Sequence, residues 1–185
     1  MMILLKNTDE ILMANLAKGN KKAASELYLR YSKSIYGYFA RMTHNMELAQ
    51  DLTQNVFLKI IQYSYNWKET KTFRFWIFRI ARNVLIDHHN AERKFFKTEN
   101  EEEVKEWDFN ISIRENYEKE QTDMLLDAMD KLPEGMRELI ELNRFQGFSY
   151  KEIAQMTLSN ENAIRVKTFR ALNKLREIMA VNQRE

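Results

Sequence analysis

Proline occurs once in the 185 residues of this chain and glycine four times, so very few positions interrupt a helix. Turn-rich all-β folds depend on such residues, and their scarcity argues against that class. Charged residues make up 30% of the chain and hydrophobic residues 44%, close to the balance of an ordinary globular protein. We therefore expect a folded, mostly helical protein.

The sequence contains no cysteine, which excludes disulfides, zinc–cysteine sites and thiol catalysis. Residues 1–6 hold a short apolar stub without the pattern of a signal peptide. No run approaches the roughly 18 apolar residues that a membrane helix needs. We therefore expect a soluble, cytoplasmic protein with no membrane insertion and no cofactor.

Three segments of different charge divide the chain. Residues 1–97 carry 16 Lys and Arg against 8 Asp and Glu, a net charge of +8, and residues 124–185 carry 10 against 9, a net charge of +1. Between them, residues 98–123 carry 3 basic against 10 acidic side chains, a net charge of −7. Such a run is typical of a solvated linker, although it could also fold back as an acidic cover over a basic surface. We predict two domains, 1–97 and 117–185, joined by an acidic linker at 98–116.

Amphipathic helices are predicted in the first domain. A short helix begins at Thr8-Asp9, and the next shows the spacing of one buried face at Leu27, Tyr31, Ile35, Phe39 and Met42. A third helix begins near Asn45, with an apolar stripe at Leu48, Leu52, Val56 and Ile60 and a second face at Asp51, Gln54, Asn55 and Leu58. A solvated surface is the ordinary explanation of that second face. Phe57, Leu58 and Ile61 leave apolar area outside the main stripe, which favours a surface that a partner covers.

Residues 68–97 combine basic and aromatic side chains. Eight Lys and Arg stand against three acids, and six aromatic residues are interleaved with them: Phe73, Phe75, Trp76, Phe78, Phe95 and Phe96. Basic side chains neutralise phosphates and aromatic faces stack on unpaired bases, so the combination favours a single-stranded or melting nucleic acid. The alternative is that the aromatic side chains form the core, since Trp76 and Ile80 share helical spacing with Val84.

Asp87, His88 and His89 resemble the signature of a class of metal-dependent phosphoesterases. Neighbouring residues on a helix point about 100° apart, so the three do not converge on one ion unaided. His44 is the one other histidine, and metal sites are dense in ligands. We therefore expect no metal site and interpret the triplet as a polar cluster near a phosphate backbone.

The second domain is predicted to contain a helix-turn-helix. Short helices are expected over 123–131 and from Pro133 to Gly147, because proline suits the first turn of a helix and glycine its end. Ser149 and Glu152 form a capping-box pattern at the start of the next helix, which ends near residue 156. A tight connection then leads to a longer basic helix, about Glu161 to Met179. Two helices joined in this way are typical of a major-groove reader, whereas the ordinary alternative is a C-terminal amphipathic helix.

The long helix has a predicted core face and a predicted DNA-reading face. The core face consists of Ile164, Thr168, Ala171, Leu172, Leu175 and Met179. The opposite side presents Asn162, Val166, Arg170 and Asn173, flanked by Arg165, Lys167 and Phe169. Five basic residues and one acid lie between 160 and 176, which fits the charge of a DNA-binding helix.

Several strings in this order carry a family resemblance: Ala49 to Lys59, Phe75 to His88, Leu132-Pro133-Glu134, Phe148 to Ala154 and Arg165 to Ala171. The first two are similar to the polymerase-binding and promoter-melting helices of region 2, and the others to region 4, of the extracytoplasmic-function group of bacterial sigma factors in the sigma-70 family. The acidic strip stands where the family has its linker, so the resemblance covers nearly the whole chain. It implies an all-α fold of two small helical domains, a region 2 bundle and a region 4 helix-turn-helix, and a protein that is not an enzyme.

The resemblance also implies partners and a role for each surface. Core RNA polymerase, through its β′ clamp helices and β flap, and promoter DNA are the implied partners, and an anti-sigma factor is a further candidate. Asp51, Gln54, Phe57 and Leu58 would contact the clamp helices. The loop Ser64 to Thr70 would hold a flipped base of the non-template strand, and the −10 DNA would lie along Arg79, Arg82, Asn83 and Asp87. The −35 element would be read by Asn162, Arg165, Val166, Lys167, Phe169, Arg170 and Lys174.

Two positions depart from the family pattern: Asn55 stands where an acidic residue is usual, and Leu158-Ser159 where glycine followed by an aliphatic residue is common. Two other classes stay open on the residues alone. A one-component transcription regulator would keep the helix-turn-helix and use the N-terminal helices for sensing or dimerisation. A metal-dependent phosphoesterase would be built on Asp87 and the two histidines that follow it. The basic-aromatic helix and the two-faced helix before it favour the sigma factor over both.

Overall fold

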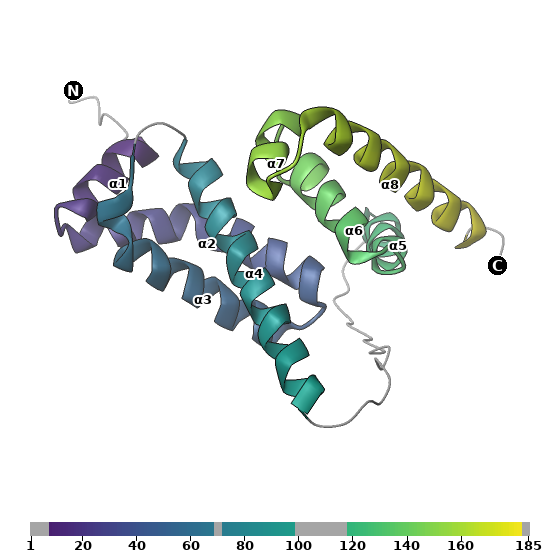
Figure 1. Ribbon diagram of the computed structural model, residues 1–185, viewed down its shortest axis with the longest axis horizontal. Coiled ribbons are helices and arrows are strands. Elements are labelled where there is room, and N and C mark those ends of the chain that lie inside the picture. The colour runs from purple at the N-terminus through teal and green to yellow at the C-terminus, as the bar shows by residue number, and fades with distance from the viewer. Residues whose placement is uncertain (1–7, 69–71, 99–117, 183–185) are drawn as a thin grey trace. The chain divides into compact units, whose positions relative to one another are not determined.

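The computed structural model describes residues 8–68, 72–98 and 118–182, which are helical apart from short connections (Figure 1). The chain divides into two compact units, Met1–Glu106 and Trp107–Glu185. The predicted all-α class, with a helical bundle followed by a helix-turn-helix, is confirmed. The exact domain boundaries stay a prediction, and the linker beyond residue 98 lies outside the described residues, as do residues 69 and 70 of the loop Ser64 to Thr70.

The N-terminal unit contains α1 (Asp9–Ala17), α2 (Lys21–Thr43), α3 (Met46–Gln62), a 3-10 turn η1 (Ser64–Asn66) and α4 (Phe73–Thr98). Helices α1, α2 and α3 each begin after a polar residue whose side chain accepts a hydrogen bond from the first turn: Thr8, Asn20 and Asn45. Helix α2 ends at His44, which has a left-handed φ of 53°. The starts predicted at Thr8-Asp9 and near Asn45 are confirmed.

The core of this unit forms where α2 packs on α1 and α3, and α3 on α4. The predicted stripe of α2 is buried at Leu27, Ile35, Phe39 and Met42, with Tyr38 added to it. The ring of Tyr38 lies edge-on to Phe39 and to Phe78 of α4, with centroids 5.3 and 6.0 Å apart. The contact between Tyr38 and Phe78 joins α4 to α2.

The C-terminal unit contains α5 (Glu118–Asp130), α6 (Glu134–Ile140), a π-helical segment η2 (Glu141–Phe145), α7 (Tyr150–Thr157) and α8 (Glu161–Asn182). The capping box of Ser149 and Glu152 is confirmed. Helix α5 begins five residues earlier than the predicted 123, and α8 extends past Met179. The helix predicted from Pro133 to Gly147 changes to π geometry at Glu141, where two polar side chains turn inward.

Those two side chains are Glu141 and Gln146, both buried. The Gln146 amide donates to the Glu141 carboxylate at 2.9 Å, which satisfies polar groups that would otherwise be costly to bury. Arg137 of α6 donates hydrogen bonds to the carbonyls of Asp130 and Leu132 and so caps the C-terminal end of α5. Burial lowers the pKa of the Arg137 guanidinium.

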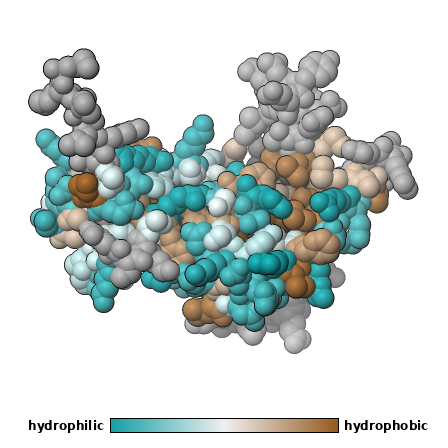
Figure 2. All heavy atoms as spheres, turned by 90° about the horizontal axis from the view of Figure 1, so that it is seen from above, coloured by the Kyte–Doolittle hydropathy of each residue, from teal (hydrophilic) through white to brown (hydrophobic). Residues whose placement is uncertain are grey.

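Apolar residues of α5, α6, α8 and the turn between α5 and α6 form one core cluster of this unit: Ala128, Met129, Leu132, Ile140, Ala171 and Leu175. The face shown in Figure 2 carries both hydrophilic and hydrophobic residues. Within the described ranges, no helix is both long and apolar enough to cross a membrane.

Candidate functional site

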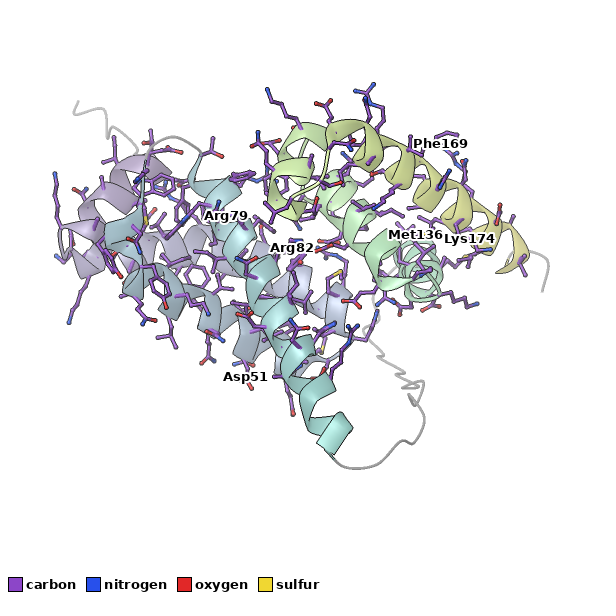
Figure 3. All side chains as sticks on the ribbon, viewed as in Figure 1. Asp51, Arg79, Arg82, Met136, Phe169 and Lys174 are labelled. Carbon is purple, nitrogen blue, oxygen red and sulfur yellow. The ribbon has the colours of Figure 1, made fainter. Side chains whose placement is uncertain are left out.

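Helix α3 has the two faces that its sequence predicts. Leu52, Val56 and Ile60 of the predicted stripe are buried against the rest of the unit together with Ala49, whereas Leu48 is half-buried. Asp51, labelled in Figure 3, and Gln54 are exposed on the opposite side. Leu58 on the same side is 65% exposed. Ile61, one turn beyond, is also exposed. We call Asp51, Gln54, Leu58 and Ile61 the outer face of α3.

Phe57 lies between the two faces of α3 and is 8% exposed. Its ring meets Tyr28 of α2 edge-on, with centroids 4.8 Å apart. Phe57 therefore supports the neighbouring surface from below and offers little area of its own. Tyr28 remains exposed and extends the apolar part of the outer face onto α2. Apolar area rimmed by polar side chains is typical of a protein-binding surface.

Helix α4 places the predicted −10 residues on one side. Arg79, Asn83 and Asp87, spaced four residues apart, are exposed. Arg82 is half-buried beside them, and both arginines are labelled in Figure 3. Asp87 is not isolated, because its carboxylate lies 3.8 Å from the Lys59 ammonium of α3. The two arginines give this side of α4 a positive charge that suits a phosphate backbone.

The aromatic residues of α4 are mostly core. Phe73, Phe75 and Phe78 are buried, so the interpretation that they stack on bases is wrong for these three. Trp76 is half-buried, and its ring lies 5.4 Å from that of Trp67. The side chains of Phe95 and Phe96 lie outside the described residues. Within the described part of α4, the rings of Phe73, Phe75 and Phe78 are not accessible for stacking, and the predicted −10 contact rests on the basic side chains.

A cavity of about 280 Å³ opens between α3 and α4. It is lined by Lys59, Tyr63, Ile80, Asn83, Ile86 and Asp87. An aromatic ring such as benzene fits a cavity of about 150 Å³, so this space is large enough for one nucleobase. Asn83 and Asp87 place hydrogen-bonding groups at its wall, and Ile80 and Ile86 supply apolar surface.

Four of these lining residues, Lys59, Tyr63, Ile80 and Ile86, are not among the −10 residues that the sequence predicts. The sequence spacing puts Lys59 of α3 one turn before Tyr63, the residue that follows the end of this helix. The spacing does not show that Lys59 and Tyr63 face α4, because that depends on how α3 and α4 pack together.

Asp87, His88 and His89 do not converge. Asp87 faces Lys59, whereas His88 lies 3.4 Å from Glu92 on its own helix. The rings of His88 and His89 are 6.0 Å apart and steeply inclined. Among the residues that the structure describes, no group of three His, Cys, Asp or Glu side chains is placed to hold a metal ion.

Helices α7 and α8 form the predicted helix-turn-helix. The Ser149 hydroxyl accepts from the Glu152 N–H at 3.3 Å, and the Glu152 carboxylate accepts from the Ser149 N–H at 2.9 Å. Leu158 ends α7 with a left-handed φ of 53°. The Asn160 side chain then accepts from the Ala163 N–H at 2.7 Å and starts α8. Local hydrogen bonds thus set both ends of the turn.

The seven residues predicted for −35 reading are all exposed on α8: Asn162, Arg165, Val166, Lys167, Phe169, Arg170 and Lys174. Phe169, labelled in Figure 3, is 62% exposed although it is a large apolar side chain. The opposite side of the helix, including Ile164 and Thr168, is buried. Exposed apolar and basic side chains on a second helix of this motif suit base edges and phosphates together.

Arg165 forms an ion pair with one neighbour and a cation–π contact with another. Its guanidinium lies 3.2 Å from the Glu161 carboxylate and 5.7 Å from the centre of the Tyr150 ring of α7. Lys174, near the other end of the face, lies 3.2 Å from Glu177. Because the Arg165 side chain is 61% exposed and that of Glu161 44%, the ion pair between them orients Arg165 only weakly.

Comparison with known proteins assigns a family to each unit. Residues 27–95 match "Sigma-70 region 2" and residues 122–175 match "Sigma-70, region 4". The RNA polymerase sigma-H factor of Pseudomonas aeruginosa is 29% identical over 181 residues, which cover 91% of this chain and 92% of that protein. The ECF RNA polymerase sigma-E factor of Haemophilus influenzae is 25% identical over 185 residues, which cover 93% and 97%.

The fold is also that of a solved sigma factor. RpoE of Bartonella quintana, in complex with the anti-sigma factor NepR, matches with a TM-score of 0.72 and 18% identity, over 85% of this chain and 96% of that one. With region 2 in the N-terminal unit, region 4 in the C-terminal unit and relatives that span the length of the chain, this protein belongs to the sigma-70 family of RNA polymerase sigma factors, in the extracytoplasmic-function group, whose members initiate transcription and are not enzymes.

Proposed function

We propose that this protein acts as an alternative sigma factor in which three exposed surfaces divide the work. The outer face of α3 binds core RNA polymerase, the basic side of α4 engages the −10 element, and the exposed side of α8 reads the −35 element. The outer face of α3 carries the proposal. Leu58 and Ile61 are both exposed on this face, one turn apart, although the helix already has a buried stripe. Apolar side chains grouped in this way within a polar rim are typical of a surface that a partner covers.

At the −10 element, Arg79 and Arg82 contact phosphates and the cavity between α3 and α4 accepts one unpaired base. A base taken out of its stack needs a pocket with hydrogen-bonding groups for its edge and apolar walls for its face. Asn83 and Asp87 supply the first, and Ile80 and Ile86 the second. We therefore propose this cavity, and not the loop Ser64 to Thr70 that the family resemblance implies, as the site of base capture.

At the −35 element, α8 lies in the major groove. Arg170 makes a bidentate contact to a guanine, and Val166 and Phe169 contact thymine methyl groups. Lys174, one turn beyond Arg170, contacts the phosphate backbone.

Two further expectations follow from the family. Core polymerase and promoter DNA are the partners, so we place the protein in the cytoplasm. An anti-sigma factor is a candidate regulator, since the similar RpoE of Bartonella quintana was solved with one.

Transcription reconstituted from purified components tests the proposal. Core polymerase, with and without this protein, is given a promoter library randomised over the −35 and −10 elements. We expect transcripts from a narrow set of promoters when both proteins are present. If the protein binds promoter fragments equally well without polymerase and adds no transcripts, it is a one-component regulator instead.

A matched pair of variants tests −35 reading in the same library. Arg170→Ala should relax the preference at one or two neighbouring positions, since a bidentate arginine contributes about 1–3 kcal/mol of discrimination. Lys174→Ala should lower output by a similar factor for every sequence. An even loss over all sequences in Arg170→Ala would show that Arg170 contacts phosphate alone.

A further inference from the structure

Helix α1 carries two neighbouring acids in its first turn, Asp9 and Glu10, directly after its cap Thr8. Acids at this position favour the positive end of their own helix dipole. Both are half-buried, and both reach beyond α1. Their contacts lead by separate routes to one residue, Phe73, where α4 begins.

Glu10 contacts the backbone of Phe73. The Phe73 N–H donates to a Glu10 carboxylate oxygen at 3.2 Å, across 63 residues of sequence. The first N–H groups of any helix lack a partner within the helix. In α4 one such group, on Phe75, is bound by the Thr72 hydroxyl at 3.3 Å, and Glu10 binds another.

Glu10 also supplies a charge that α4 lacks. The first turn of α4 contains no acid and does contain Arg74. A positive side chain at the positive end of a helix is unfavourable, and a carboxylate there is favourable. Helix α1 therefore provides the negative charge that most helices carry in their own first turn.

Asp9 contacts the side chain of Phe73 through Tyr31. The Tyr31 hydroxyl donates to one Asp9 oxygen, and the Arg30 guanidinium lies 2.7 Å from the other. The ring of Tyr31 then meets the ring of Phe73 edge-on, with centroids 5.1 Å apart. Phe73 is fully buried. Backbone and side chain of the first residue of α4 are thus both held by the first turn of α1.

We propose that Asp9 and Glu10 are positioning residues for promoter melting, an inference that rests on the proposed function of α4. They place the start of the helix that carries Arg79, Arg82 and Asn83, and so set the spacing between α3 and α4 where the cavity lies. Neither acid is part of the DNA-contacting or polymerase-binding surfaces.

The test compares Glu10→Ala with Glu10→Gln, which keeps an acceptor, and with Glu47→Ala, the first-turn acid of α3. Strand opening by the holoenzyme is followed by permanganate reactivity, on a duplex promoter and on the same promoter held open by mismatches at −10. Losing a hydrogen bond of ordinary strength should lower duplex opening about fivefold to tenfold in Glu10→Ala. The mismatched template should restore opening, because the strands are already separated. Glu47→Ala should stay close to the unchanged protein. Glu10→Gln should lie between Glu10→Ala and the unchanged protein, because it keeps the acceptor for the Phe73 N–H but loses the negative charge at the start of α4.

Hydrogen exchange of the free protein measures, without polymerase, how firmly Glu10 holds the start of α4. In Glu10→Ala, the amides of the first two turns of α4 should exchange faster, while those of α3 keep their rates. The proposal is overturned if α4 exchange is unchanged, if opening falls equally on both templates, or if core binding falls with it. If the unchanged protein opens neither template, the proposed function fails. The exchange measurement still decides whether Glu10 holds the start of α4 in place.

Discussion

Leu158 lies in a backbone region that leucine seldom occupies, with φ at 53° and 96% of its side chain exposed. A left-handed leucine costs about 1–2 kcal/mol, because its Cβ approaches the following carbonyl. Glycine is free of this strain but loses about 0.5–1 kcal/mol more chain entropy on folding. We predict that Leu158→Gly raises the free energy of unfolding by about 0.5–1 kcal/mol, measured by chemical denaturation.

Gly147 provides the matched control for Leu158. Its φ is 67°, and a Cβ added there would meet no atom within 4 Å. Gly147→Ala therefore tests backbone strain without crowding, and should lower the free energy of unfolding by about 1 kcal/mol. A loss of stability in Leu158→Gly would mean that the exposed leucine has a packing partner in the folded state.

Tyr31 links stability to alkaline pH. Burial raises the pKa of its phenol, and the hydrogen bond to Asp9 raises it further. The folded-state pKa is then above the unfolded value of about 10, so the stabilisation is complete below pH 10 and is lost as the pH rises through the folded-state value. We predict that Tyr31→Phe is less stable than the unchanged protein at pH 8, and that the difference shrinks above about pH 10. A difference that is constant with pH, in urea unfolding, would contradict this.

At the scale of the element, the outer face of α3 can be separated from the core by mutation. Gln54→Ala with Leu58→Ala removes exposed side chains, so the melting temperature should change little. Affinity for core polymerase should fall about tenfold, the effect of losing roughly 1.4 kcal/mol from the interface. A binding titration with purified core measures the affinity, and thermal unfolding measures the stability.

Leu52→Ala is the contrasting variant, because Leu52 is on the buried face of the same helix. It should lower the free energy of unfolding by about 2–5 kcal/mol. If the outer-face double variant loses stability in the same way, that face is structural and does not bind polymerase.

Helix starts could be predicted where a side chain caps its own helix, as at Thr8, Asn45 and Ser149, since cap and helix are neighbours in sequence. The buried Glu141 could not. A glutamate in a helical pattern indicates solvent, and its partner Gln146 is recognised when the π-helical segment brings the two together. The hydrogen bond from the Phe73 N–H to Glu10 could not be predicted for a similar reason, because 63 residues separate the two and no periodicity relates them.

At the scale of the whole molecule, the order of the surfaces could be predicted better than their chemistry. Period and charge located the outer face of α3 and the exposed face of α8, since each lies on one helix. Base stacking by the phenylalanines of α4 was predicted wrongly for the three that are buried. A basic helix with buried phenylalanines has the same composition as one whose phenylalanines stack on bases. The cavity required two helices to be packed before Lys59 and Tyr63 could be assigned to it.

Each unit has its own buried core, so neither needs the other in order to fold. Joining them in one chain instead affects binding, because it keeps the second unit close to its site once the first is bound. A tether between two binding modules makes the second contact intramolecular, with an effective concentration of the order of millimolar for short flexible linkers. We predict that a chain cut between residues 98 and 118 gives two folded halves, of which the N-terminal half still binds core polymerase. Mixed at micromolar concentration, they should support about 10²- to 10⁴-fold less transcription from a −35-dependent promoter than the intact chain. If the mixture matches the intact chain at equal concentration, each half is recruited independently, and joining them contributes nothing to promoter use.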